Sequence, residues 1–172
     1  MVSMGCPYDL DPQAYLARSP ERLTLQGYRG WTWAIASRSP KPWREVRRLY
    51  ADELPECAPA TLEALSHFVE TLGLCASCPL RMRRCEAKGV CRDEALVLAL
   101  VAAIQHADSQ AIERSLSAMC PVQVERVGEA AASFAIIMKM QDRVLLPIPA
   151  SVIEHILERA GDPFEPASKT LH

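Results

Sequence analysis

The chain has 172 residues, of which 49% are apolar and 23% are charged, and its formal net charge is −2. This length suits one compact domain, and this composition excludes a wholly disordered chain. So small a net charge gives no electrostatic indication of an acidic or a basic partner.

Apolar residues at helical spacing, interrupted by proline and glycine, predict four helices in the first half of the chain. Ser19, followed by Pro20 at the first helical position, is expected to cap the second helix, and Gly73 to end the fourth. Gly27 and Gly30 lie within the second helix, where small residues would allow close contact with another helix. The expected ranges are about 12–18, 20–35, 43–54 and 59–72.

The second half of the chain predicts further helices. Residues 95–107 are apolar nearly all round, as in a central buried helix, and Asp93 and Glu94 lie at the positively polarised start of this helix. Asp108 is expected to cap the helix that follows. Residues 143–148 alone have a strand-like composition, and a single strand needs a partner. The other expected ranges are about 109–120, 124–138 and 151–160.

These segments predict an all-α protein, an irregular bundle of six to eight helices that forms a single compact domain over residues 1–172. Residues 74–91 are expected to form a cysteine-rich excursion from the bundle, and residues 163–172 a loose C-terminal tail. The longest apolar run has ten residues, whereas a membrane-spanning helix needs about 20, so no membrane contact is expected. The N-terminus lacks the basic and apolar regions of a secretory signal, which predicts a cytoplasmic protein with reduced cysteines.

Four of the seven cysteines fall within seventeen residues, in the pattern C-x2-C-x6-C-x5-C. A C-x2-C pair suits metal binding because a tight turn brings both sulfur atoms to one ion, at about 2.3 Å for zinc. Two more thiolates would complete a tetrahedral zinc site or hold an iron–sulfur cluster, and both cofactors stay open. The alternative is a set of buried or incidentally oxidised thiols with no cofactor. The predicted metal ligands are Cys75, Cys78, Cys85 and Cys91.

Pro79 bears on the local structure and on the choice of metal. Proline lacks the N–H group that zinc knuckles use to stabilise their thiolates, and Cys-Pro is common beside iron–sulfur clusters. Because proline also suits the first position of a helix, a short helix is expected from Pro79 to Lys88, where Gly89 ends it. The sulfur atoms of Cys78 and Cys85 would then lie on one face of this helix.

The stretch 75–85 resembles the C-x2-C-P segment of WhiB-type iron–sulfur regulators, and the likeness implies cluster-binding cysteines. That family leaves five residues before its next cysteine, where this chain has six, and it takes a ligand from further upstream. Its Gly-Trp-Gly turn is also missing here. We therefore treat the likeness as local cysteine chemistry and not as membership of the family.

The remaining candidate ligands have simpler interpretations. Cys6, Cys57 and Cys120 have no partner at metal spacing and are expected to be structural. His67 lies off the apolar face of its helix, as an ordinary surface histidine does.

Ten of the nineteen lysine and arginine residues fall in two short stretches. Three arginines of the first stretch share one helix face, with a tryptophan nearby, which is typical of a surface that contacts phosphate groups or nucleic acid. Positive charge in the second stretch would also offset the negative charge of a thiolate-ligated metal. The alternative is a pair of solvated faces balanced by acidic neighbours. The candidate contacts are Arg44, Arg47, Arg48, Arg81, Arg83 and Arg84.

The chain has no phosphate-binding glycine loop, zinc-protease helix or nucleophile-elbow motif, and its four histidines form no recognisable triad. Nothing in the sequence therefore indicates an enzyme. The leading hypothesis is a metal- or cluster-binding accessory or regulatory protein. The competing hypotheses are a helical interaction module, which binds a protein partner or a second copy of the chain, and a nucleic-acid-binding regulator.

Overall fold

The fold is all-α, as the sequence predicts. The computed structural model describes residues 12–76, 80–83 and 88–159, and these residues form eight helices and no strand. Seven of the eight begin within two residues of the position that the sequence predicts, and the fifth begins three residues earlier. The helices are α1 (Pro12–Ala17), α2 (Ser19–Ser37), α3 (Lys41–Glu53), α4 (Ala58–Cys75), α5 (Arg92–His106), α6 (Ser109–Met119), α7 (Val124–Met140) and α8 (Ala150–Arg159).

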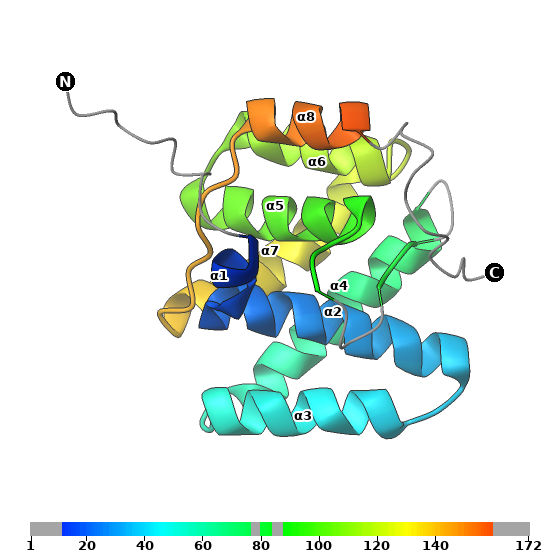
Figure 1. Cartoon of the computed structure of the whole chain (residues 1–172), viewed down its shortest axis with the longest axis vertical. Helices are drawn as coiled ribbons and strands as arrows, with labels where there is room; N and C mark the ends of the chain where they lie inside the picture. The colour runs from blue at the N-terminus through cyan, green and yellow to red at the C-terminus, as the bar shows by residue number, and fades with distance from the viewer. Residues whose placement is uncertain (1–11, 77–79, 84–87, 160–172) are drawn as a thin grey trace.

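Helix α5 lies in the middle of the molecule, with α2 on one side and α6 and α8 on the other (Figure 1). Every residue from Asp93 to Ala103 is buried, including those that face α7. A helix surrounded in this way needs apolar side chains around its whole circumference, which is the pattern of its sequence. The prediction of a central buried helix is confirmed.

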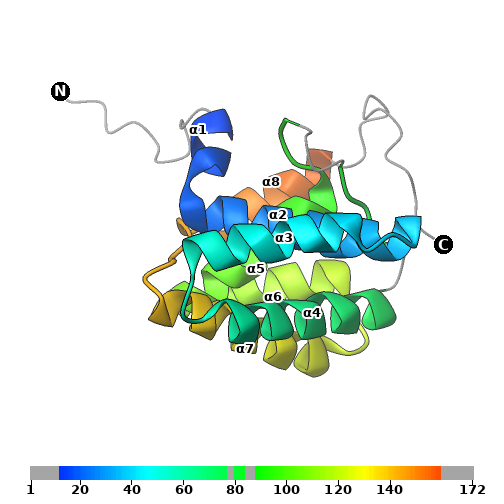
Figure 2. The ribbon, with the colours of Figure 1, turned by 90° about the horizontal axis from the view of Figure 1, so that it is seen from below.

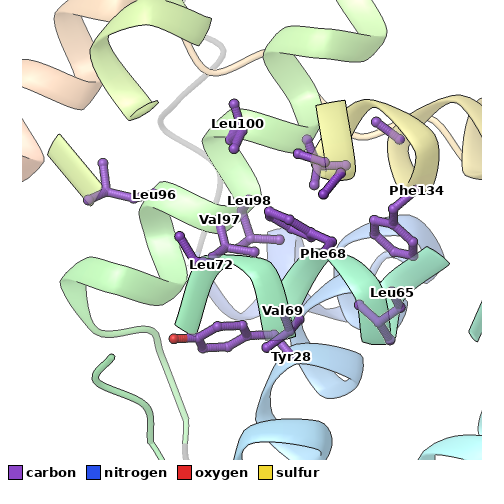
Figure 3. Close-up of a cluster of buried hydrophobic side chains, with 14 of the residues drawn as sticks. Tyr28, Leu65, Phe68, Val69, Leu72, Leu96, Val97, Leu98, Leu100 and Phe134 are labelled. Atoms are coloured by element: carbon purple, nitrogen blue, oxygen red, sulfur yellow. The ribbon is translucent and has the colours of Figure 1, made fainter. Parts of the chain in front are cut away.

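Helices α4 and α7 lie side by side in Figure 2 and form much of the core. Phe68 of α4 stacks on Phe134 of α7, with ring centroids 6.4 Å apart. Figure 3 shows this pair with Leu65 and Leu72 of α4 and with Val97 of α5. Aromatic pairs and leucines at helical spacing bury large apolar areas, so this cluster supplies much of the stabilising free energy.

Helices α2 and α3 are in close contact because two glycines of α2 leave room for their neighbours. A Cβ atom at Gly27 would lie 2.6 Å from Leu65 Cδ2 and 2.7 Å from the Tyr50 hydroxyl oxygen. At Gly30 it would overlap the side chain of Val46. Only glycine allows this approach, so the expectation of close helix contact at both positions is confirmed.

Residues 143–148, which have a strand-like composition, form no strand in the described part of the chain. Side chains take the place of a strand partner. The Gln105 side chain donates to the Arg143 carbonyl oxygen over 3.0 Å and accepts from the Leu145 amide over 2.8 Å, while Glu21 accepts from the Leu146 amide over 2.9 Å. Buried backbone groups must find partners, and here two helices supply them.

Three expectations about helix ends can be compared with the structure. Asp108 caps α6, where its carboxylate accepts from the Ala111 amide over 3.0 Å, as predicted. Ser19 makes no cap; it is the first residue of α2, and its hydroxyl donates to Glu53 over 2.8 Å. Gly73 does not end α4, because the helix continues to Cys75, whose buried position extends the packed face by half a turn.

None of the helices in the described ranges is long and apolar enough to cross a membrane. The predicted C-terminal tail, 163–172, lies outside the described residues.

Candidate functional site

The four predicted metal ligands fall in and beside the segment that joins α4 to α5. Cys75 is the last residue of α4, and Cys91 immediately precedes α5; both side chains are buried. Cys78 and Cys85 lie outside the described residues. Within the ranges that the structure describes, no three His, Cys, Asp or Glu side chains are placed to hold one metal ion.

Residues 80–83 are not helical, so the expected helix from Pro79 to Lys88 is wrong for its described part. The backbone amide of Arg81 donates to Asp93 over 2.7 Å, and that of Arg83 donates to Glu94 over 2.7 Å. Both carboxylates belong to the first turn of α5. Charged acceptors form stronger hydrogen bonds than peptide carbonyls, which favours this non-helical backbone over the local helix signal.

Two further contacts fix the segment against the core. The Tyr28 hydroxyl donates to the Arg81 carbonyl oxygen over 3.1 Å, and its ring lies beside Val69 in Figure 3 with the oxygen pointing away from the apolar cluster. Burial and then the nearby Asp93 carboxylate raise the pKa of Tyr28, so the hydroxyl stays a donor. The Met82 side chain is itself buried.

Glu94 is the centre of the site. Its side chain is fully buried and pairs with the equally buried Arg29 of α2, over 2.8 Å from Nε and 3.0 Å from Nη2. The same carboxylate accepts from the amides of Arg83 and Cys91, over 2.7 and 2.9 Å. Arg29 in turn donates to the Gly89 carbonyl oxygen over 2.7 Å. One ion pair thus holds both ends of the chain that runs from residue 83 to residue 91.

The Cys91 thiol lies beside this acidic turn. Burial, and after it the Glu94 charge, raise the pKa of Cys91 from 9.0 to about 12. The sulfur atom lies 3.5 Å from the Arg81 carbonyl oxygen, to which the thiol donates. In the metal-free protein Cys91 is therefore a protonated thiol, and a metal ion that binds it has to release this proton.

In the reduced, metal-free protein, Cys57 is expected to react with iodoacetamide at least about tenfold faster than Cys91 near pH 8. Cys57 is half-buried, whereas the Cys91 side chain is 4% exposed. Because its pKa is raised on folding, the stability that Cys91 contributes is complete below about pH 9 and is lost as the pH rises toward 12. Residue-resolved mass spectrometry measures both rates, and equal rates would contradict the burial of Cys91.

Cys120 is completely buried, which fits the expectation of a structural cysteine. Its thiol donates to the Cys75 carbonyl oxygen over 2.8 Å, and the Cys75 thiol donates to Gln123 Oε1 over 3.1 Å. Cys57 is half-buried at the start of α4, and Cys6 lies outside the described residues. His67 is exposed on α4, as the sequence predicts for a surface histidine.

The predicted phosphate-contacting residues lie in two separate places. Arg44, Arg47 and Arg48 are exposed on α3, where Arg47 borders an open groove of about 420 Å³ between α3 and α4. Trp43, Pro59 and Leu62 line the apolar part of this groove, and Glu63 also borders it.

In the second basic stretch, Arg81 is exposed and Arg83 is half-buried, and their amides serve to anchor the segment. Arg84 lies outside the described residues.

Sequence reasoning placed Asp93 and Glu94 at the start of a helix but missed their role as acceptors for the cysteine-rich segment. The glutamate three residues after Cys91 has the spacing of a capping box, which could have indicated its bond to the Cys91 amide. Arg29 could not be found in this way, because it lies 65 residues from Glu94 in the chain.

Comparisons with family models, with curated proteins and with solved structures found no match to this chain.

Proposed function

We propose that the chain is a metal- or cluster-binding accessory or regulatory protein of the cytoplasm. Cys75, Cys78, Cys85 and Cys91 are the proposed ligands of zinc or of an iron–sulfur cluster. The observation that carries the proposal is the shared attachment of the Arg83 and Cys91 amides to the Glu94 carboxylate.

This attachment closes the chain between residues 83 and 91 into a loop. Cys85 follows Arg83 by two residues in the sequence, so only a short length of chain separates it from this anchored end of the loop. Holding ligand-bearing backbone in place before binding reduces the conformational entropy that metal binding costs. The attachment therefore favours convergence of these two cysteines on one ligand.

The charges around the segment support the same function. Four thiolates around a divalent ion carry a net negative charge, which nearby cations would stabilise. Arg81 is exposed on the segment, and Arg92, at the first position of α5, pairs with Asp93 over 3.4 Å. Arg29 pairs with Glu94 and offsets part of its charge, the remainder of which raises the pKa of Cys91.

Titration of the reduced, metal-free full chain with zinc, against a chromophoric chelator, tests the proposal. The wild-type chain is expected to bind one equivalent, and Cys78→Ser or Cys85→Ser to weaken binding at least about tenfold. Cys57→Ser is the control and should bind as the wild type does. Reconstitution with iron and sulfide under anaerobic conditions, followed by a visible spectrum, distinguishes a cluster from zinc. If neither metal binds, the proposal is wrong.

A second function is favoured by the groove between α3 and α4. We propose that it binds an acidic segment of a protein partner, with an apolar side chain of that segment against Trp43 and Leu62. Arg44 and Arg48, exposed on α3, complement acidic residues that flank such a side chain. Nucleic acid is the less favoured occupant, because apolar residues line much of the groove and Glu63 borders it.

Fluorescence anisotropy with a labelled peptide of alternating glutamate and leucine tests this second function. Arg47→Glu is expected to weaken peptide binding at least about tenfold, an effect of about 1.4 kcal/mol. Arg126→Glu, which changes an exposed arginine on α7, is the matched control and should have little effect. Tighter binding of duplex DNA than of the peptide would reject the peptide and favour the nucleic-acid hypothesis.

A further inference from the structure

Two cysteines that lie 45 residues apart in the sequence meet where α4 and α6 end and α7 begins. The Cys120 thiol lies 2.8 Å from the Cys75 carbonyl oxygen, and Gln123, just before α7, accepts from the Cys75 thiol. Cys120 is completely buried, and the Cys75 side chain is 9% exposed. The junction therefore holds two thiols, one of which reaches the surface.

The contact limits how far apart the two sulfur atoms can be. A carbonyl oxygen lies about 2.4 Å from the Cα atom of its own residue, so Cys120 Sγ is at most about 5 Å from the Cα atom of Cys75. Sulfur atoms on one tetrahedral ion, with bonds of about 2.3 Å, are separated by roughly 3.8 Å. Because the Cys75 sulfur lies about 2.8 Å from its own Cα atom, the two sulfur atoms are at most about 8 Å apart. Rotation of the Cys75 side chain away from Gln123 is the movement that would bring them closer.

The surroundings give a reagent access from one side. Leu74 and Val122, the neighbours of Cys75 and Gln123 in the chain, are 72% and 84% exposed. Gln123 is itself exposed, so the side chain that accepts from the Cys75 thiol faces solvent. An amide side chain on the surface moves aside at little cost, because water replaces its hydrogen bonds.

We propose that Cys75 and Cys120 form a two-thiol site for thiophilic ions, such as cadmium or trivalent arsenic. The site uses none of the other three proposed metal ligands, Cys78, Cys85 and Cys91. It therefore does not rest on the proposed zinc or iron–sulfur function. Because both sites use Cys75, a metal held by the four cysteines of the segment excludes occupation of this pair. The pair is therefore a property of the metal-free chain.

Phenylarsine oxide is a suitable probe because it needs two neighbouring thiols. Each thiol forms one sulfur–arsenic bond, and the two thiol protons leave with the oxide oxygen as one molecule of water. Arsenic stays trivalent throughout, so no oxidant or reductant is required.

The test treats the reduced, metal-free full chain with one equivalent of phenylarsine oxide and maps the bridged peptides by mass spectrometry. The expected product has one arsenical bridging Cys75 and Cys120. Cys120→Ser is expected to reduce uptake more than tenfold, although the serine hydroxyl can still donate to the Cys75 carbonyl oxygen and keep the fold. Cys57→Ser, which changes a free cysteine outside both sites, is the control and should react as the wild type does.

A bridge between Cys75 and Cys78, or uptake that survives Cys120→Ser, overturns the inference. The peptide map of the wild-type chain decides the question even if a variant fails to fold. Zinc binding that depends on Cys78 and Cys85, together with no bridge to Cys120, would leave the proposed function standing and reject this one. A bridge to Cys120 in a chain that binds no zinc or iron would support the two-thiol site and reject the proposed metal-binding function.

Discussion

Replacement of Arg29 by methionine is expected to lower the free energy of unfolding by about 3–5 kcal/mol. The guanidinium group and its partner Glu94 are 1% and 0% exposed, so the variant leaves a buried carboxylate without its counter-charge. It also removes the donor to the Gly89 carbonyl oxygen. Denaturant unfolding followed by circular dichroism measures the change.

The double variant Arg29→Met, Glu94→Gln separates the ion pair from the rest of the packing. A glutamine has no charge to bury and keeps an acceptor oxygen for one of the two amides, since Arg83 donates to Oε1 of Glu94 and Cys91 to Oε2. The double variant is therefore expected to be more stable than Arg29→Met alone. A loss of less than about 1 kcal/mol in Arg29→Met would mean that the pair is hydrated, and the account of the site would fail.

Gly30→Ala is expected to destabilise the protein by about 1–3 kcal/mol, although alanine is the better helix former. A Cβ atom there would overlap the Val46 side chain and lie 3.3 Å from the Pro42 carbonyl oxygen. Helices α2 and α3 would have to separate. Thermal or denaturant unfolding measures whether the substitution lowers or raises the free energy of unfolding.

Gly73→Ala is the matched control. Gly73 also lies within a helix, but among the described residues an added Cβ atom would meet only Leu80 Cδ1, at 3.9 Å. Helix propensity should therefore decide the effect of Gly73→Ala, which is expected to raise the free energy of unfolding by up to about 1 kcal/mol. If both substitutions stabilise the protein, the close contact of α2 with α3 is not present in solution.

The sequence predicts the helices well because the signals for them are local. Each signal lies within or beside the helix that it predicts. Examples are a proline at or near a helix start, Asp108 as a cap and the apolar circumference of residues 95–107. The same reasoning fails for residues 80–83, where the local preference for a helix after a proline competes with groups further along the chain. The carboxylates of Asp93 and Glu94 bind the amides of the segment instead.

The site was predictable only in part, for a similar reason. The spacing of the cysteines indicates a candidate site, and the position of Asp93 and Glu94 indicates the start of a helix. The partners that give them a role are far away in the chain, Arg29 from α2 and Cys120 from the end of α6. Spacing along a sequence does not reveal contacts between residues brought together by packing, and a single sequence offers no other signal for them.

Metal content is the most direct test of the claim that Glu94 holds a metal-binding cysteine segment. Elemental analysis of the anaerobically purified wild-type chain is expected to give about one zinc ion, or at least about two iron atoms, per chain. Glu94→Gln keeps every cysteine but loosens the attachment, so its metal content should fall several-fold. Glu63→Gln, which changes an exposed carboxylate on α4, should retain the wild-type content. A wild-type chain with neither zinc nor iron, or a Glu94→Gln variant with undiminished metal, would contradict the account.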